Sequence, residues 1–226
     1  MWRPVLSDKL ARRPLVPIAI FGTGGLGREI ASVLRETAAG QVLKPVGFVV
    51  DAAFDAPRSV HELPVWRDAS HAISEYPGLS FIVALGGPTQ RAEVAGRLDA
   101  LLVRYATLVH PSAQLGRTVG VGEGSVVLGL CSITTDARIG RHCVINPGVT
   151  IAHDCQIGDF VTIGPGAALA GGVVIEDGAE LGIGARILPR CRIGRSAIIG
   201  AGAVVTGDVA PETTMVGVPA RLISRG

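Results

Sequence analysis

The sequence predicts an α/β domain over residues 1–106, followed by an all-β domain over residues 107–226. The composition divides the chain there, because eight of its nine aromatic residues lie in the first part and 21 of its 31 glycines in the second. The first part alternates short apolar runs with amphipathic helical patterns. The second part carries an uninterrupted six-residue repeat. These patterns belong to different architectures, so two domains are expected.

The composition favours an aliphatic core and excludes several kinds of protein. Of the 226 residues, 48% are hydrophobic but only 4% aromatic, which is too apolar for a disordered chain. The net charge is +2, and Lys and Arg are scattered, whereas a nucleic-acid groove needs a basic stripe. The apolar run over residues 14–22 is too short for a membrane span or a signal peptide. We therefore expect a cytoplasmic protein with reduced cysteines, no nucleic-acid partner and no membrane insertion.

The first domain is predicted to contain a parallel sheet with Rossmann-like winding. Pro17–Gly22, Val46–Asp51 and Ser80–Gly87 are apolar runs typical of strands. Gly22–Glu36 is a Gly-rich turn that opens a helix, and Pro88–Tyr105 is predicted as a second, longer helix with proline in its first turn. Strands that alternate with helices favour parallel pairing.

The glycines of the first turn indicate a binding site for an anionic ligand. Gly22, Gly24 and Gly27 have the spacing of a dinucleotide fingerprint, in which backbone N–H groups approach a phosphate. Asp51 follows the second strand, where a carboxylate accepts hydrogen bonds from ribose or base. A domain of roughly 90 residues with few strands fits a mononucleotide or nucleotide sugar better than NAD. A strand–turn–helix without any ligand remains the alternative.

The repeat of the second domain predicts a three-sided parallel β-helix. Every sixth residue from Leu115 to Val205 is Leu, Ile or Val, and the residue four positions later, from Val119 to Ala203, is always Val, Ser, Cys or Ala. Each hexad is one short strand and a turn, and three hexads complete a coil of 18 residues. The aliphatic residue points inward, and the small residue fits the corner. Stacked coils bury a continuous column, and so narrow a prism has no room for aromatic rings.

All four cysteines fall in the small-residue position of the hexad. They are Cys131, Cys143, Cys155 and Cys191. A metal site or a disulfide framework would be the functional interpretation, but no C-x-x-C pair is present. We expect small buried hydrophobic residues instead.

The order of the two domains resembles a known family. The motifs are GTGGLG, GFVVDA, VALGGPTQR, LVHPSA, NPGVTIAHDCQIGDF, GPGAALAGGV and GVPARLI. Together they resemble the bacterial sugar acetyltransferases that include sialic acid O-acetyltransferases and nucleotide-4-amino-sugar N-acetyltransferases. The resemblance implies that the β-helix is left-handed, that acetyl-CoA is the co-substrate, and that the first domain holds a nucleotide sugar.

His153 is the predicted general base. It is the third residue of its hexad, so it points away from the interior position of Ile151, and Asp154 follows it. An imidazole accepts a proton near neutral pH, and a nearby carboxylate stabilises the resulting cation. Since one coil has 18 residues, residue 171, a glycine, is expected directly above His153. In the resembled family the histidine of this motif is the base, the acid supports it, and the backbone N–H at this glycine holds the oxyanion.

The resemblance also implies contacts with acetyl-CoA and a trimeric assembly. The matched cofactor positions are Thr162, Ile183 and Ala201. Family members often have histidine in place of Thr162, whose hydroxyl is then the expected donor. Three subunits pack side by side in the resembled enzymes, with each active site between neighbours, so a homotrimer is expected here.

The predicted nucleotide-sugar contacts are Gly24, Gly25, Leu26, Asp51 and Gly86. Many family members have histidine in place of Leu26, so a side-chain contact with the sugar nucleotide is lost at this position.

The predicted activity is transfer of acetyl from acetyl-CoA to the amine of a nucleotide-linked amino sugar, of the UDP-4-amino-sugar type, for surface glycans. O-acetylation of a sialic-acid-like sugar and a non-catalytic β-helix that only binds a sugar nucleotide are the alternatives. A metal enzyme of the γ-carbonic anhydrase type would need three histidines around zinc, and only His142 and His153 lie in the coils. No metal is therefore expected.

Overall fold

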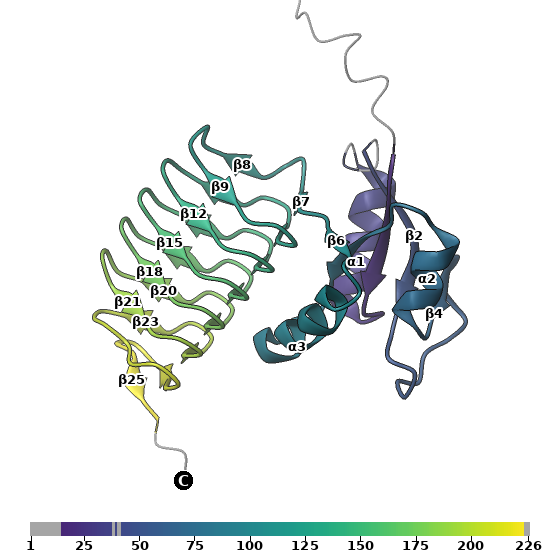
Figure 1. Cartoon of the computed structure of the whole chain (residues 1–226). Coiled ribbons are helices and arrows are strands. Elements are labelled where there is room, and N and C mark those ends of the chain that lie inside the picture. The colour runs from purple at the N-terminus through teal and green to yellow at the C-terminus, as the bar shows by residue number, and fades with distance from the viewer. Residues whose placement is uncertain (1–14, 38, 40–41, 224–226) are drawn as a thin grey trace, which may run out of the picture.

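The computed structural model describes residues 15–37, 39 and 42–223. The first domain is a sheet with helices, and the second is a β-helix beside it (Figure 1). The sheet has the order β3-β4-β2-β1-β5-β6. Its strands are β1 (Val16–Phe21), β2 (Leu43–Val49), β3 (Ser59–Val60), β4 (Leu63–Trp66), β5 (Ser80–Val83) and β6 (Arg104–Tyr105). The helices are α1 (Gly25–Glu36), α2 (Ala69–Glu75) and α3 (Pro88–Asp99). All pairs are parallel except β3–β4.

Two glycines of the first turn are required for β1 and α1 to pack closely. Gly22 has φ +110°, a conformation that side chains rarely adopt. A Cβ on Gly27 would lie 2.0 Å from the Gly22 carbonyl oxygen. Gly24 and Gly25 instead face open space. The Gly-rich turn therefore combines two glycines that serve packing, Gly22 and Gly27, with two that leave room, Gly24 and Gly25.

The second domain is a β-helix with three flat faces. Face 1 has the strand order β7-β10-β13-β16-β19-β22-β24-β25, face 2 has β8-β11-β14-β17-β20-β23, and face 3 has β9-β12-β15-β18-β21. The strands are β7 (Leu108–Val109), β8 (Gln114–Leu115), β9 (Gly120–Val121), β10 (Val126–Val127), β11 (Ser132–Ile133), β12 (Arg138–Ile139), β13 (Val144–Ile145), β14 (Thr150–Ile151), β15 (Gln156–Ile157), β16 (Thr162–Ile163), β17 (Ala168–Leu169), β18 (Val174–Ile175), β19 (Glu180–Leu181), β20 (Arg186–Ile187), β21 (Arg192–Ile193), β22 (Ile198–Ile199), β23 (Val204–Val205), β24 (Thr214–Val216) and β25 (Arg221–Leu222).

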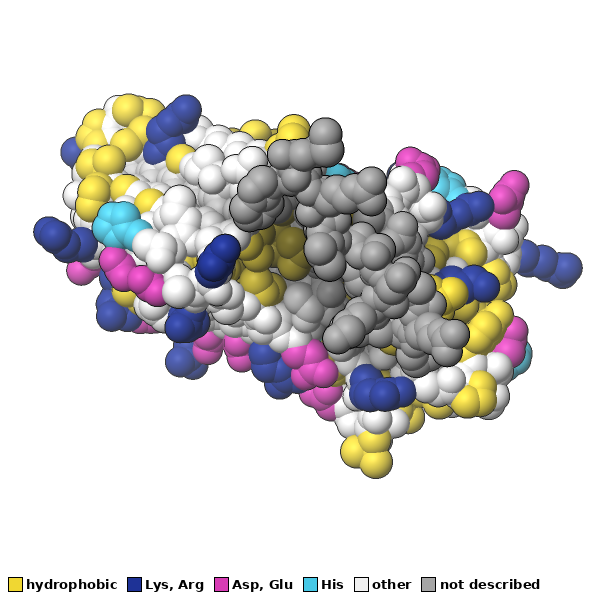
Figure 2. All heavy atoms as spheres, turned by 90° about the horizontal axis from the view of Figure 1, so that it is seen from above, with side chains coloured by type: hydrophobic (Ala, Val, Ile, Leu, Met, Phe, Trp, Pro, Cys, Tyr) yellow, Lys and Arg dark blue, Asp and Glu magenta, His cyan; other side chains and the backbone are white. Residues whose placement is uncertain are grey.

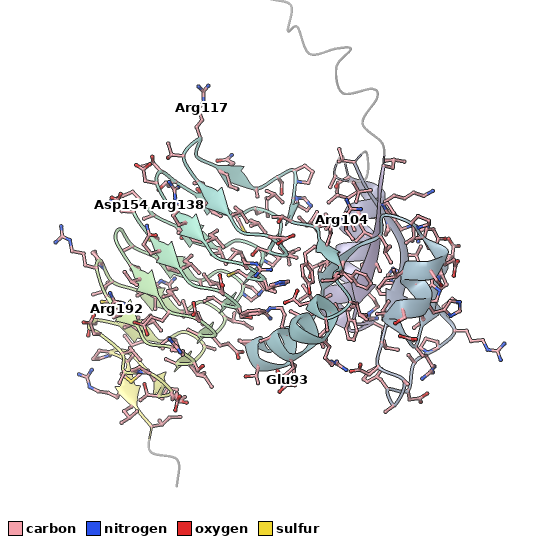
Figure 3. All side chains as sticks on the ribbon, in the orientation of Figure 1. Glu93, Arg104, Arg117, Arg138, Asp154 and Arg192 are labelled. Carbon is pink, nitrogen blue, oxygen red and sulfur yellow. The ribbon has the colours of Figure 1, made fainter. Side chains whose placement is uncertain are left out.

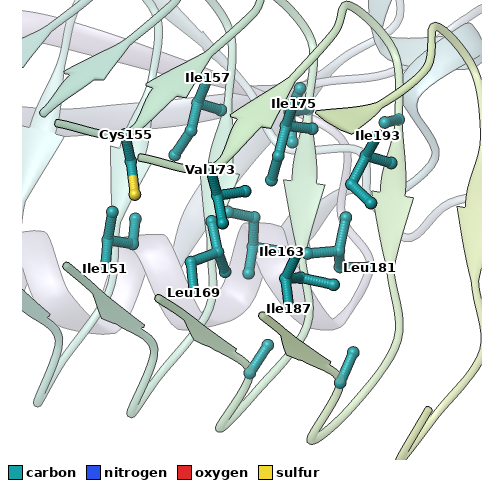
Figure 4. Packing of buried hydrophobic residues seen from close by; sticks show 14 of the residues in the cluster. Ile151, Cys155, Ile157, Ile163, Leu169, Val173, Ile175, Leu181, Ile187 and Ile193 are labelled. Carbon is teal, nitrogen blue, oxygen red and sulfur yellow. The ribbon is translucent and has the colours of Figure 1, made fainter. Parts of the chain in front are cut away.

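The six-residue period is confirmed. Each of the sixteen aliphatic positions from Leu115 to Val205 is the second residue of a two-residue strand. Residues 18 apart pair in parallel, as Ile151 does with Leu169 and Ile157 with Ile175. Their side chains form the interior column shown in Figure 4. The four cysteines are free and buried, and burial raises the pKa of Cys143 to about 11.

Several elements differ from the sequence-based prediction. The helix that begins at Pro88 ends at Asp99 rather than Tyr105, because Leu102 takes φ +55° and the chain turns into β6. The elements that were not predicted are the β3–β4 hairpin, α2 and β6 of the first domain, β7, which lies one hexad before Leu115, and β24 and β25 at the end of the β-helix. The division at residues 106 and 107 stays a prediction.

The two domains meet at face 1. Leu108, Val126 and Leu128 of the β-helix belong to the same buried cluster as Ile30 and Leu34 of α1. The contact is therefore a hydrophobic core, which fixes how the first domain sits on the coils.

His142 lies at this junction, buried between two aromatic rings. It is 1% exposed, stacks on Phe160 at a centroid distance of 5.0 Å, and meets Tyr105 edge-on at 4.4 Å. Neither ring nitrogen has a hydrogen-bond partner among the described residues. Burial and, secondarily, the charge of Arg141 lower the pKa of His142 to about 4.

Acid is expected to destabilise the protein through His142. The unfolded histidine binds a proton below about pH 6.5, whereas the folded one resists protonation until about pH 4. The free energy of unfolding is therefore unaffected by this histidine above pH 6.5 and falls as the pH falls toward 4, by about 2 kcal/mol between pH 6.5 and 5. Urea unfolding across this range measures the loss. His142→Phe keeps the ring but cannot titrate, so its free energy of unfolding should fall less. Equal losses in both proteins would contradict the assignment.

Candidate active site

A cavity of about 300 Å³ opens at the carboxyl ends of β1, β2 and β5. Gly24, Gly25, Leu26, Asp51 and Gly86 all line it, so the structure brings the five predicted substrate residues together. Their roles stay predictions. In parallel α/β sheets, ligands bind in the crevice at the strand ends.

The glycine turn gives the cavity a wall of backbone. α1 begins at Gly25, and the capping residue Gly24 has no side chain to satisfy the first N–H groups of the helix. A Cβ at either glycine would meet nothing within 4 Å, so both positions leave room for a ligand. Free N–H groups and the dipole of α1 favour a phosphate here.

Three further lining or supporting residues were not identified from the sequence. Thr23 and the exposed Phe54 line the cavity. Arg97 of α3 holds Asp51 by two hydrogen bonds, of 2.7 and 3.0 Å, and the Asp51 contact raises the pKa of Arg97. Phe54 could have been noticed as one of few aromatic residues, three positions after Asp51. The Arg97 contact spans 46 residues and leaves no local signal.

His153 and Asp154 form a pair on the edge between faces 2 and 3, here called the His153 edge. They lie in the turn between β14 and β15, where Ile151 and Cys155 are buried and His153 and Asp154 are exposed. The His153 Nδ1 lies 2.7 Å from the Asp154 Oδ2, and the side chains are 62% and 64% exposed. The contact holds one ring nitrogen and leaves Nε2 for a substrate.

Gly171 lies against this imidazole, one coil further along the β-helix. The Gly172 N–H donates to the His153 carbonyl at 2.9 Å, which fixes the stacking of the two turns. A Cβ on Gly171 would lie 2.5 Å from both the Cε1 and the Nε2 of His153. Among the described residues, no group accepts the Gly171 N–H. A free donor thus lies beside the free nitrogen of the histidine.

Ile183 and Ala201 lie on a different edge. They are in the turns between faces 1 and 2, here called the Ile183 edge, and the Gly202 N–H donates to the Ile183 carbonyl at 2.8 Å. Ile183 is 63% exposed. Within one chain these two positions do not meet His153.

Thr162 lies on neither of these edges but on face 1, in β16. It is buried at the domain junction, where its hydroxyl donates to the Gly86 carbonyl at 2.7 Å and accepts from Arg91 at 2.9 Å. The first position of a coil strand points outward, but the first domain covers face 1 here. The hydrogen of this hydroxyl is thus already donated to a protein group, and the contact with acetyl-CoA stays a prediction.

The cavity and His153 lie on opposite sides of the β-helix. The first domain packs on face 1, whereas the edge between faces 2 and 3 is the one remote from it. Figure 3 shows Asp154 at the outer margin of the coils and Arg104 in the first domain. A sugar held in the cavity does not reach the histidine of its own chain.

Charge gives little further indication of a ligand. Cationic and anionic side chains are interspersed on the face seen in Figure 2. No group of three His, Cys, Asp or Glu in the described residues could hold a metal ion. None of the helices in residues 15–37, 39 and 42–223 is long and apolar enough to cross a bilayer.

Comparison with known proteins decides the family. The PglD N-terminal domain model matches residues 17–98, and the bacterial transferase hexapeptide model matches residues 136–171 and 172–207. The structure of PerB from Caulobacter crescentus, in complex with CoA and GDP-perosamine, is 33% identical and superposes with a TM-score of 0.83. The match covers 92% of this chain and 97% of that one. The chain belongs to the PglD-type sugar acetyltransferases.

Other PglD-type acetyltransferases agree. The acetyltransferase domain of PglB from Neisseria gonorrhoeae, solved with acetyl coenzyme A, is 27% identical with a TM-score of 0.82, over 93% of this chain and all of that one. A UDP-N-acetylbacillosamine N-acetyltransferase of Bacillus subtilis is 36% identical over 115 residues, which span 49% of this chain and half of that protein. The predicted family and the left-handed hexapeptide β-helix are thus confirmed, and the two structures that contain CoA or acetyl-CoA support the predicted co-substrate.

Proposed function

We propose that this PglD-type acetyltransferase transfers acetyl from acetyl-CoA to the amine of a nucleotide-linked amino sugar, for surface glycans. The observation that carries the proposal is the free Gly171 N–H beside the Nε2 of His153. The names of the Caulobacter and Bacillus relatives support an amino sugar and nitrogen as the acceptor atom.

The amine attacks the thioester carbonyl of acetyl-CoA. A nitrogen–carbon bond forms, and the Nε2 of His153 takes the proton that the amine loses. Asp154, at Nδ1, stabilises the imidazolium and fixes which nitrogen is free. The carbonyl oxygen becomes an oxyanion that accepts from the Gly171 N–H. Collapse breaks the carbon–sulfur bond, and the imidazolium returns its proton to the thiolate, which leaves the N-acetyl sugar and CoA.

We further propose that the site is completed between subunits of a homotrimer. The cavity and His153 of one chain face opposite ways, so the acceptor in one subunit needs the His153 edge of another. The same corner position of four successive coils on the Ile183 edge carries uncharged residues, namely Pro147, Pro165, Ile183 and Ala201. An uncharged edge suits both the packing of a second subunit and the binding of the pantetheine arm of acetyl-CoA. Residues 1–106 then hold the nucleotide sugar and residues 107–226 deliver acetyl. The cytoplasmic location stays a prediction.

Acetyl transfer is tested with purified protein, acetyl-CoA and a panel of UDP-, GDP- and dTDP-linked amino sugars and their hydroxyl counterparts. We expect release of the CoA thiol with at least one amino sugar. Gly25→Leu extends into the cavity and should raise the KM for the nucleotide sugar about tenfold or more, with an unchanged KM for acetyl-CoA.

Gly96→Leu is the matched control, because Gly96 also faces open space but lies on α3 outside the cavity. If none of the amino sugars in the panel gave release of the CoA thiol, the proposed activity would be refuted. An unchanged KM in Gly25→Leu would refute the cavity as the acceptor site.

A further inference from the structure

Arg91 of α3 is a fully buried cation that joins the two domains. It pairs with no carboxylate in the part of the chain that the structure describes. Its guanidinium donates instead to acceptors in both domains: the carbonyls of Leu85 (2.5 Å), Gly86 (2.9 Å), His142 (2.7 Å), Phe160 (2.8 Å) and Val161 (3.4 Å), and the hydroxyl of Thr162 (2.9 Å). Burial lowers the pKa of Arg91 to about 10, so it stays charged at neutral pH.

Thr162 closes this network on the wall of the cavity. Its hydroxyl donates to the Gly86 carbonyl, which also accepts from Arg91. Gly86 lines the cavity, whereas Thr162 lies in β16 of the β-helix, 76 residues further along the chain. The cavity wall is thus fastened to one particular coil.

That coil is the one that carries His153. The chain runs from β14 through the turn of His153 to β15 and then to β16, so His153 and Thr162 share one 18-residue turn of the β-helix. Subunits packed side by side have corresponding coils at the same height. The Arg91 network therefore places the cavity of one subunit level with the histidine of its neighbour.

We propose that Arg91 and Thr162 are positioning residues that hold the acceptor cavity at the height of the His153 coil. The inference rests on the proposed function. It gives position 162 a role in placing the acceptor rather than in binding acetyl-CoA. The residues touch neither substrate, and they act through Gly86.

The test compares Thr162→Val, which removes the hydroxyl with little change of shape, with Thr162→Ser, which retains it. Thr162→Val leaves a buried guanidinium N–H and the Gly86 carbonyl short of a partner. We expect its kcat/KM for the nucleotide sugar to fall about tenfold or more, its KM for acetyl-CoA to stay within about twofold, and Thr162→Ser to restore the wild-type values. Thr150→Val is the control, because Thr150 holds the same strand position on the exposed face 2. Thr162→Ala replaces the valine variant if that does not fold.

If the wild type is active, either of two outcomes overturns the inference. Equal kinetics in Thr162→Val and the wild type would show that the hydroxyl positions nothing. A rise confined to the KM for acetyl-CoA would show that Thr162 serves the cofactor. A wild type that transfers no acetyl overturns the proposed function, and the inference is then tested by calorimetric binding of UDP and GDP. Weaker nucleotide binding by Thr162→Val but not by Thr162→Ser supports the positioning role. Equal binding by all three proteins, or no binding by any, refutes it.

Discussion

His153→Asn is expected to lower kcat by about 10²–10⁴ while both KM values change little. The asparagine amide nitrogen takes the place of Nδ1 beside Asp154, but nothing takes the place of Nε2, which faces Gly171 in the structure. Proton removal from the amine is the step that is lost, so the effect belongs in kcat. Initial rates of thiol release at saturating acetyl-CoA and nucleotide sugar measure it.

His71→Asn is the control for this substitution, because His71 is an exposed residue of α2 in the first domain. It should keep the wild-type rate. A His153→Asn enzyme that retained more than about a tenth of the wild-type kcat would remove His153 from the role of base, since general-base catalysis accounts for at least a hundredfold.

Gly171→Ala is expected to lower kcat by about 10²–10³ without unfolding the protein. The new Cβ would lie 2.5 Å from Cε1 and Nε2 of His153, so the exposed imidazole must turn aside. The methyl group also occupies the space beside the Gly171 N–H, where the oxyanion is to bind. Steady-state kinetics and thermal unfolding separate the two effects, because only the former should change markedly.

Gly207→Ala provides the matched control. Gly207 lies two coils above Gly171 on the His153 edge, and a Cβ there meets nothing within 4 Å. It should behave as the wild type does. If Gly171→Ala retained full activity as well, the space beside the His153 ring at Gly171 could not be needed for the reaction.

The candidate base and oxyanion donor could be predicted from the sequence because stacking alone brings them together. The six-residue period fixes that residues 18 apart lie in adjacent coils, and the structure places Gly171 on the His153 ring as this arithmetic requires. The glycine turn and Asp51 could likewise be placed at strand ends, because a parallel sheet puts those ends on one edge.

The domain junction could not be predicted in this way. An arginine on an amphipathic helix is expected in solvent, and Arg91 is buried only because face 1 covers it. The acetyl-CoA contact at Thr162, which the family resemblance implied, likewise took no account of the first domain that covers this position. These contacts depend on how two separately encoded units dock, and the repeat carries no information about that.

Because the coils are uninterrupted, the number of residues from His153 to Gly171 fixes the distance between the base and the oxyanion donor. No loop longer than a corner intervenes between residues 115 and 205, so an inserted or deleted residue between His153 and Gly171 would move every later side chain to another facet of the prism. Only insertions or deletions of 18 residues keep the later side chains on the same faces. In this part of the gene, changes in length are therefore constrained to multiples of 18 codons. Beyond Gly171, a whole coil of 18 residues could be added or removed without changing the pair.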